Sequence, residues 1–248
     1  MMVIKSPDEV AIMRRAGKIV ATILQRLKEE VKPGIKTRQL DSVAVNELKK
    51  AGAKASFKGY QGFPAYLCVS VNDEIVHGIP GELMLNEGDI VSLDFGAFYN
   101  GFHGDAAITV GVGRISPQTQ ELLTVTEGAL TAGIEAARCG ARLGDVSVAI
   151  QSYVEARGFS VVREYSGHGV GRDLHEDPLV PNFGICGEGP VLQKGMTLAL
   201  EPMVTVGDWR TRLCENQWTV VTADGSLSAH FEHTVAISDS EPEVLTLL

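Results

Sequence analysis

The chain has 248 residues, of which 44% are hydrophobic and 21% charged, and its formal net charge is −9. The length suffices for a substantial core, and the composition excludes disorder as the main state. The negative charge and the lack of a Lys/Arg run argue against binding to nucleic acid by phosphate neutralisation. Because no apolar run reaches the roughly 18 residues needed to cross a bilayer, no membrane partner is expected.

The N-terminal segment carries acidic residues where a secretory signal would be apolar, so a cytoplasmic location is expected. It has instead the features of a helix start, with Ser6 as the N-cap, Pro7 at the first helical position and Glu9 closing a capping box. The four cysteines lie far apart without a CxxC pair, which is typical of reduced thiols rather than a zinc knuckle or a disulfide framework.

Helical periodicity predicts helices over 7–31 and 37–51, separated by the segment VKPGIKT. Strand-like runs follow at 65–71, 89–98 and 103–112. After Pro117 the order repeats, with helices expected to Arg138 and Arg157. The strand-like runs of this second part lie at 159–165, 196–204, 217–223 and 227–237.

A helix–helix–strands block therefore occurs twice, at about 1–115 and 116–248. Nearly the same spacing separates Gly34 from Gly88 and Gly140 from Gly195, and the segments EGDIVSLD and KGMTLALE that follow both end in an acid. Identity between the blocks is low, so coincidence is the alternative to duplication. The lack of a Pro/Ser-rich linker near position 116 favours a single catalytic domain spanning 1–248.

The segment SLDFGAFYNGFHGDAAI predicts a hairpin with Asn100 and Gly101 as a two-residue type I′ turn. In that register Gly96 opposes Asp105, so Asp94 lies on the same face as Asp105 and diagonal to it. Two buried acids so close repel each other unless one is protonated or a cation lies between them. A solvated hairpin face is the alternative, but the flanking residues are typical of buried strands.

Two glutamates of the second half enlarge this set. Glu201 ends the apolar run LALEPMV, where Pro202 cannot donate to a ladder. Glu232 lies inside the strand-like run LSAHFEHTVAI, where a glutamate is costly unless it is paired or bound to a cation. With Asp94, Asp105 and one histidine, these acids suit Mn(II), Fe(II) or Co(II). Four carboxylates and an imidazole favour two ions about 3.5–4 Å apart.

The glycine-rich segment YSGHGVGRDLHEDP holds His168 and His175, two of only six histidines. Glycines let a backbone approach a ligand closely, and histidine is a common metal ligand and acid–base group. A surface turn with two unrelated histidines is the alternative. Of the others, His103 is left unassigned, and His230 and His233 are interpreted as packing or supporting residues rather than ligands.

This set of candidate ligands resembles that of the methionine aminopeptidases of the pita-bread metallopeptidase family. Its order along the chain is Asp94, Asp105, His168, Glu201 and Glu232. The resemblance runs nearly end to end and includes the segments KPGIKT, VNDEIVHGIP, GFHGDAA, GMTLALEPM and SLSAHFEHT. The lack of an N-terminal extension or a long helical insert is similar to the type I enzymes. The implied fold is α+β, the pita-bread (creatinase/aminopeptidase) fold, with pseudo-twofold halves and a curved antiparallel sheet covered by helices.

The resemblance implies two divalent metal ions: Mn, Fe or Co, with Zn as a further candidate. It places Asp94 on one ion, His168 and Glu201 on the other, and Asp105 and Glu232 between them. In the implied reaction Glu201 moves a proton as general base and then acid.

The resemblance also implies how substrate is held. His77 would contact the scissile amide nitrogen, and His175 would hydrogen-bond the carbonyl oxygen. The apolar pocket for methionine would include Tyr60, Phe63, Cys68 and Trp218, with simple core packing as the alternative for the aromatic residues. Three positions depart from the family pattern, and these apolar exchanges affect pocket dimensions rather than the reaction: Phe57 for cysteine, Phe63 for tyrosine and Leu174 for phenylalanine.

The expected function is metal-dependent removal of the initiator methionine from nascent proteins whose second residue is small. The expected partners are a peptide or nascent-chain N-terminus and, transiently, the ribosome, and the expected state is a monomer. An Xaa-Pro aminopeptidase or prolidase-like hydrolase is the enzymatic alternative. A non-catalytic binding protein on the same fold is disfavoured, because every ligand is present and the net charge is negative.

Overall fold

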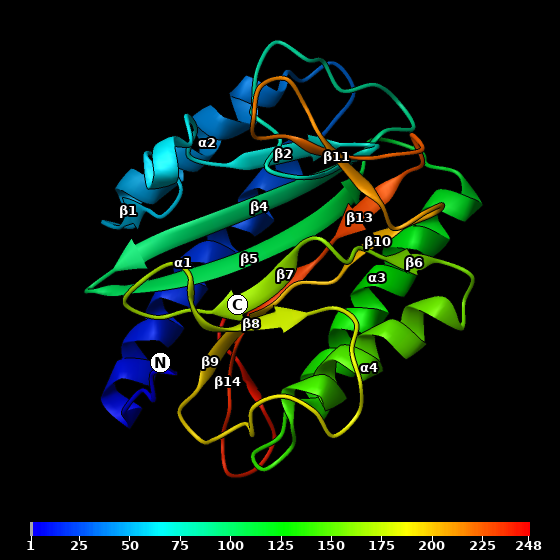
Figure 1. Cartoon of the computed structure of the whole chain (residues 1–248). Coiled ribbons are helices and arrows are strands. Elements are labelled where there is room, and N and C mark those ends of the chain that lie inside the picture. Colours follow the sequence, from blue (N-terminus) through cyan, green and yellow to red (C-terminus); the bar gives the residue numbers. More distant parts are fainter. Residues whose placement is uncertain (1) are drawn as a thin grey trace.

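The computed structural model describes residues 2–248, which form a mixed fold of helices packed on a large antiparallel sheet (Figure 1). Its α-helices are α1 Pro7–Glu30, α2 Thr37–Lys50, α3 Pro117–Ala136 and α4 Leu143–Glu155. The predicted helix ends agree with these to within two residues. No helix in the described part of the chain is long and apolar enough to cross a membrane.

The main sheet takes strands from both halves of the chain, in the order β1-β4-β5-β14-β9-β7-β8. Two further strands pair at its sides, β2 with β4 and β15 with β14. The bounds are β1 Lys54–Ala55, β2 Cys68–Val71, β4 Ile90–Tyr99, β5 Phe102–Gly111, β7 Ser166–Gly169, β8 Glu176–Pro181, β9 Thr197–Leu200, β14 Glu232–Ala236 and β15 Glu243–Val244. The contact between β5 and β14 therefore joins the two halves.

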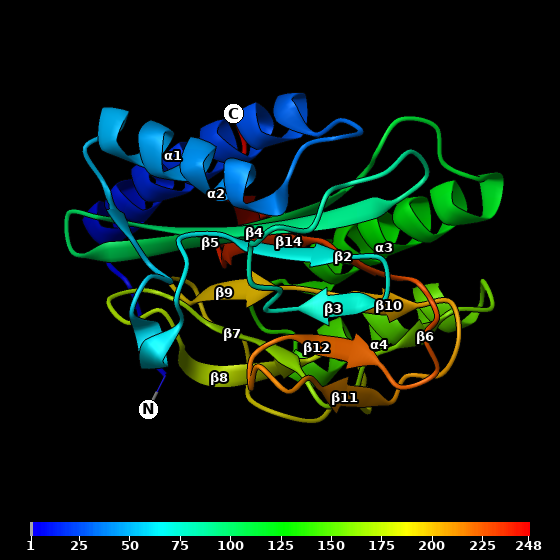
Figure 2. The ribbon, with the colours of Figure 1, turned by 90° about the horizontal axis from the view of Figure 1, so that it is seen from above.

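Two small antiparallel sheets lie beside the main one, with strand orders β13-β10-β6 and β11-β12-β3. Their strands are β3 Glu74–Val76, β6 Ser160–Val161, β10 Met203–Thr205, β11 Thr211–Leu213, β12 Val220–Thr222 and β13 Ser228–His230. A short 3₁₀ turn, η1, covers Tyr60–Gly62. Seen from above, α1 and α2 cover one face of β4 and β5, whereas β3, β7, β8, β11 and β12 lie on the opposite side (Figure 2).

Local sequence signals explain the first helix and the long hairpin. Ser6 caps α1 by accepting from the backbone N–H of Glu9, whose carboxylate accepts from the backbone N–H of Ser6. In the hairpin Gly96 pairs with Asp105, as predicted, and Asn100 and the glycine after it form the left-handed turn. Gly104 lets α1 approach β5 closely, because a Cβ there would lie 2.8 Å from the backbone of Gly17.

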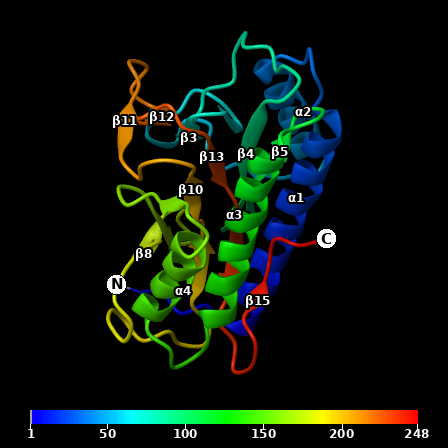
Figure 3. The ribbon, with the colours of Figure 1, turned by 90° about the vertical axis from the view of Figure 1, so that its right-hand side faces the viewer.

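The two halves repeat the same local geometry at their helix junctions. Gly34 and Gly140 both have φ near +90°, and their backbone N–H groups donate to Leu85 and Leu192. Each junction then makes one isolated antiparallel bridge, Lys36 with Met84 and Arg142 with Val191. One large apolar cluster lies beneath α1 and α2, and a second lies beneath α3 and α4, which pack side by side (Figure 3).

Several strand-like runs are interrupted where the sequence pattern suggested continuity. The run 196–204 breaks at Glu201 and Pro202, where proline has no N–H to donate to a ladder. The run 227–237 breaks at Phe231, so β13 and β14 join different sheets. The glycine-rich segment forms β7, a loop and β8 rather than a simple turn, and most of 159–165 lies outside any strand.

Candidate metal centre and substrate pocket

A cavity of about 330 Å³ lies on the face of the main sheet that α1 and α2 leave open. All eleven side chains that the sequence predicted for the site line it: Tyr60, Phe63, Cys68, His77, Asp94, Asp105, His168, His175, Glu201, Trp218 and Glu232. Residues without a predicted role also line it, including Glu164, Tyr165 and Met203, and so does His230, which the sequence predicts to be a packing or supporting residue. One end of the cavity is acidic and the other is aromatic.

Strand register brings three of the acids onto one face. Asp94 on β4 and Glu232 on β14 both pair with Ala107, which lies on β5 between them. Directly paired residues point to the same side of a sheet, as do residues two apart on one strand. Asp105 therefore shares the face of Ala107, and the three carboxylates converge.

The other two candidate ligands join this face from the far side of β14. Thr234, two residues after Glu232, pairs with Ala199 on β9, which in turn pairs with His168 on β7. Glu201 follows β9 directly, two residues beyond Ala199. Five neighbouring strands thus each carry or lead to one candidate ligand, although these residues are spread over more than half of the sequence.

The donor atoms are close enough to share metal ions. One ligand atom each from Asp105, His168 and Glu232 lies within 4.8 Å of the others. The Nε2 atom of His168 is 3.5 Å from Oε1 of Glu201, and the Nε2 atom of His230 is 3.8 Å from Oε2. Asp105, His168 and Glu232 are each at most 5% exposed, so water contributes little to solvating this charge.

The acids carry an electrostatic cost that cations would remove. Burial raises the pKa of Asp94 to about 7. Burial, with repulsion from neighbouring carboxylates, raises the pKa values of Asp105, Glu201 and Glu232 well above their ordinary values. One carboxylate oxygen each of Asp94, Asp105 and Glu232 is buried and has no hydrogen-bond partner among the described residues. Such orphaned, mutually repelling oxygens fit divalent cations.

His168 has the tautomer that a metal ligand requires. Its Nδ1 donates to the backbone oxygen of Gly169 at 2.8 Å, which leaves a lone pair on Nε2 facing the carboxylate of Glu201. Burial, together with the neighbouring His175, lowers the pKa of His168 to about 3, so the ring is neutral at pH 7. A lone pair and a carboxylate oxygen that face each other at 3.5 Å repel, and a cation between them would remove this repulsion.

His77 and His175 flank this acidic floor. The Nδ1 atom of His175 lies 2.7 Å from the hydroxyl of Tyr60, and the His175 ring stands edge-on to that of His168 at 4.2 Å. Burial lowers the pKa of His175 and lowers that of His77 to about 4. His77 also has a left-handed backbone, with φ of 59°, a costly conformation for a non-glycine residue that is often found at functional sites.

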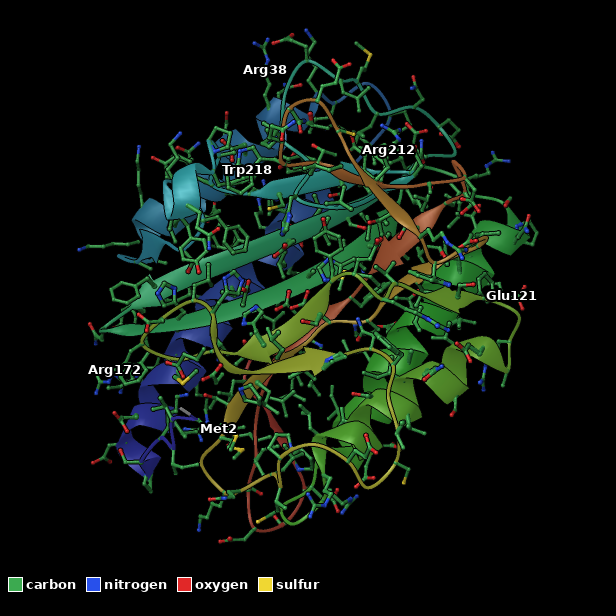
Figure 4. The ribbon with its side chains drawn as sticks, in the orientation of Figure 1. Met2, Arg38, Glu121, Arg172, Arg212 and Trp218 are labelled. Atoms are coloured by element: carbon green, nitrogen blue, oxygen red, sulfur yellow. The ribbon has the colours of Figure 1, made fainter. Side chains whose placement is uncertain are left out.

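The aromatic end of the cavity is one packed cluster from distant segments. Buried Phe57, Phe63, Ala65, Cys68 and Leu174 form it, with Tyr60, Ile79 and Trp218 packed against them. The rings of Phe63 and Trp218 meet edge to face at 5.2 Å. Trp218, labelled in Figure 4, lies between β11 and β12, lines the cavity and packs against the cluster that contains Cys68 at the start of β2.

The remaining three histidines differ in their contacts and in whether they face the cavity. His230 is 1% exposed and lies beside Glu201, and neither ring nitrogen has a hydrogen-bond partner among the described residues. His233, on the opposite face of β14, pairs its Nδ1 with Thr246. His103 pairs its Nδ1 with the hydroxyl of Ser56 and does not line the cavity.

Comparisons with known proteins agree with this geometry. The model of metallopeptidase family M24 matches residues 11–239. Methionine aminopeptidase of Clostridium perfringens is 54% identical over 248 residues, covering 100% of both chains, and methionine aminopeptidase 1 of Bacillus subtilis is 53% identical over 246 residues, covering 99% of each. The crystal structure of methionine aminopeptidase from Thermotoga maritima superimposes with a TM-score of 0.99 at 49% identity over 100% of both chains.

The chain therefore belongs to metallopeptidase family M24, whose members use divalent metal ions. The predicted α+β pita-bread fold is confirmed. Within the family the chain falls among the methionine aminopeptidases: it is an enzyme, a hydrolase that acts on peptide substrates.

Proposed function

We propose that this enzyme removes the N-terminal methionine of peptides and nascent chains whose second residue is small. The observation that carries the proposal is the cavity itself, in which a cluster of buried acids adjoins an aromatic pocket. The pocket suits the unbranched, polarizable side chain of methionine. A bulky second side chain would collide with the wall of the metal site.

We infer that the site holds two divalent ions. Asp94 would bind one ion, His168 and Glu201 the other, and Asp105 and Glu232 would lie between them. Carboxylates with a single imidazole suit Mn(II), Fe(II) or Co(II), with Zn(II) as a further candidate. The orphaned carboxylate oxygens and the lone pair of His168 support this assignment.

When bound, the ions would supply a water of lowered pKa and polarise the scissile carbonyl. Glu201 would take the proton from the attacking water and deliver it to the leaving amine nitrogen, so that one amide bond breaks and one carboxylate and one amine form. Its position among the other acids supports this role, because burial and the neighbouring carboxylates raise the pKa of Glu201 well above its ordinary value.

His175 would donate a hydrogen bond to the substrate carbonyl oxygen as negative charge develops on it. For this the ring must present N–H at Nε2, which follows if the hydroxyl of Tyr60 donates to Nδ1. His77 would contact the scissile amide nitrogen. Phe63, Cys68 and Trp218, with Tyr60, would surround the methionine side chain.

Peptide turnover by metal-stripped protein tests the proposal. After chelation, the enzyme is assayed on Met-Ala-Ser and on a Leu-Pro peptide, with and without Mn(II), Fe(II) or Co(II). Metal-dependent release of methionine from the first peptide alone is expected, and it would rank the metals. Cleavage only before proline would instead indicate an Xaa-Pro aminopeptidase. Folded protein that turns over neither peptide would indicate a binding protein.

A monomeric state, a cytoplasmic location and a transient contact with the ribosome stay predictions. The negative net charge is compatible with a brief ribosome contact rather than tight binding to RNA. Sedimentation of the metal-loaded enzyme measures its oligomeric state, and co-sedimentation with translating ribosomes at two salt concentrations measures the contact.

A further inference from the structure

The N-terminal segment has an inverted pattern of burial. Val3 and Ile4 are 43% and 48% exposed, whereas the side chain of the adjacent Lys5 is only 2% exposed. A lysine is almost never fully buried unless it is paired. Its partner is Glu176, whose side chain is 6% exposed and whose Oε2 atom lies 2.5 Å from Nζ of Lys5.

Glu176 uses its second carboxylate oxygen to close the loop between β7 and β8. Oε1 accepts from the backbone N–H of Arg172 at 2.8 Å. Glu176 also directly follows His175, and the loop delivers both Leu174 and His175 to the cavity. The ion pair therefore joins the N-terminal segment to the loop that carries a residue proposed to contact substrate.

Two glycines leave the room that Lys5 needs. A Cβ at Gly171 would lie 2.5 Å from Cε of Lys5, and a Cβ at Gly195 would lie 2.5 Å from its backbone oxygen. The backbone N–H of Lys5 donates to Gly195 at 2.8 Å, just before β9. Lys5 is thus held between the turn that leads towards Glu201 and the loop that carries His175.

We propose that Lys5 is a positioning residue: its buried pair with Glu176 fixes the 171–176 loop and so aims His175 at the substrate carbonyl. The inference rests on the role of His175 proposed above. A second contact to the same loop, between Arg172 and Glu9, is mostly exposed and lies at the edge of the fold beside α1 (Figure 4). Exposed pairs of this kind contribute little. The loop has other contacts, because the backbone N–H of His103 donates to Gly171 and Arg172 lies over the ring of Phe102. The pair of Lys5 and Glu176 differs from these in being an ion pair buried on both sides, and such a pair is costly to break.

A double-mutant cycle tests whether Lys5 acts through His175. Lys5→Met keeps the length of the side chain but leaves the buried carboxylate of Glu176 without its cationic partner. We expect kcat on Met-Ala-Ser to fall about 10-fold or more with little change in KM, since misplacing a catalytic group by about 1 Å costs up to about 100-fold. In the His175→Ala background the same change should lower kcat less than about twofold, because coupled residues are not additive.

Hydrogen exchange of the metal-free protein supplies a second readout that does not depend on turnover. The backbone amide of Arg172 should exchange faster in Lys5→Met, while amides in the middle of α1 stay protected. The double variant Lys5→Met/Glu176→Gln removes the unpaired charge and should recover part of the protection and of kcat. Lys36→Met, which breaks an exposed pair with Glu82, is the matched control and should change neither.

Two results would overturn the inference. Unchanged exchange at 171–176 in Lys5→Met would show that the pair does not hold the loop. An equal fall in kcat in both backgrounds would show that Lys5 acts through general packing. If His175→Ala alone keeps full activity, the proposed role of His175 fails and the catalytic consequence of Lys5 fails with it, whereas the exchange data still report whether the pair orders the loop.

Discussion

Removing one acid from the metal site is expected to stabilise the metal-free protein in a pH-dependent way. Burial raises the pKa of Asp94 from 3.8 to about 7. Because the folded-state pKa is raised, the stability linked to this group is present below pH 3.8 and is lost as the pH rises through about 7. The difference between these two pKa values, at about 1.4 kcal/mol per pH unit, corresponds to a loss of folding stability of at most about 4 kcal/mol.

Asp94→Asn removes this cost and keeps the shape of the side chain. Without metal, the variant should be more stable than the parent by up to about 4 kcal/mol at pH 8. At pH 5 the difference should be only about 2 kcal/mol, because that pH lies much closer to the unfolded-state pKa of 3.8 than to the folded-state pKa of about 7. Relief of repulsion on Asp105 and Glu201 acts in the same direction. With metal bound the sign should reverse, because a ligand has been lost.

Urea unfolding in the presence of chelator, at pH 5 and pH 8, measures both differences. Asp224→Asn is the control of opposite sign, since backbone hydrogen bonds lower the pKa of this exposed carboxyl to about 2. That variant should lose stability by the same amount at both pH values, because the contribution of Asp224 disappears only as the pH falls towards 2. A metal-free Asp94→Asn protein that is less stable than the parent at pH 8, or whose advantage does not grow with pH, would refute the reasoning.

Substitutions at three further residues test other parts of the site. Glu201→Gln should lower kcat by about 100-fold or more while the protein still folds, because the proton carrier is lost; near-normal turnover in a steady-state assay would reassign that role. Phe63→Ala should raise KM for Met-Ala-Ser more than it lowers kcat, and an unchanged KM would place methionine elsewhere. His77→Asn should lower kcat without changing the melting temperature, since asparagine tolerates the left-handed backbone, whereas His77→Val should lower both; equal melting temperatures would argue against backbone strain at this position.

The features that the sequence predicted are those set by residues close together in the chain. The capping box of Ser6 and Glu9 starts α1, and the Asn100–Gly101 turn fixes the register that pairs Gly96 with Asp105. Both depend on local hydrogen bonds and turn geometry, so they need no knowledge of the rest of the fold. The order of acids along the chain, compared with a known family, then sufficed to identify the candidate ligands.

Only the tertiary structure decided which distant segments meet. Pairing of β14 with both β5 and β9 joins Glu232 to Asp105 and Glu201, and it separates His230, which faces the cavity, from His233, which does not. Strand alternation places His230 and His233 on opposite sides, but it does not say which side faces the cavity, and the two residues lie on strands of different sheets. The burial of Lys5 was equally invisible to local rules, since its partner is 171 residues away and an apolar segment ending in a lysine ordinarily exposes the charge. Sequence order supplied the chemistry of this site, whereas long-range strand pairing and packing supplied its geometry.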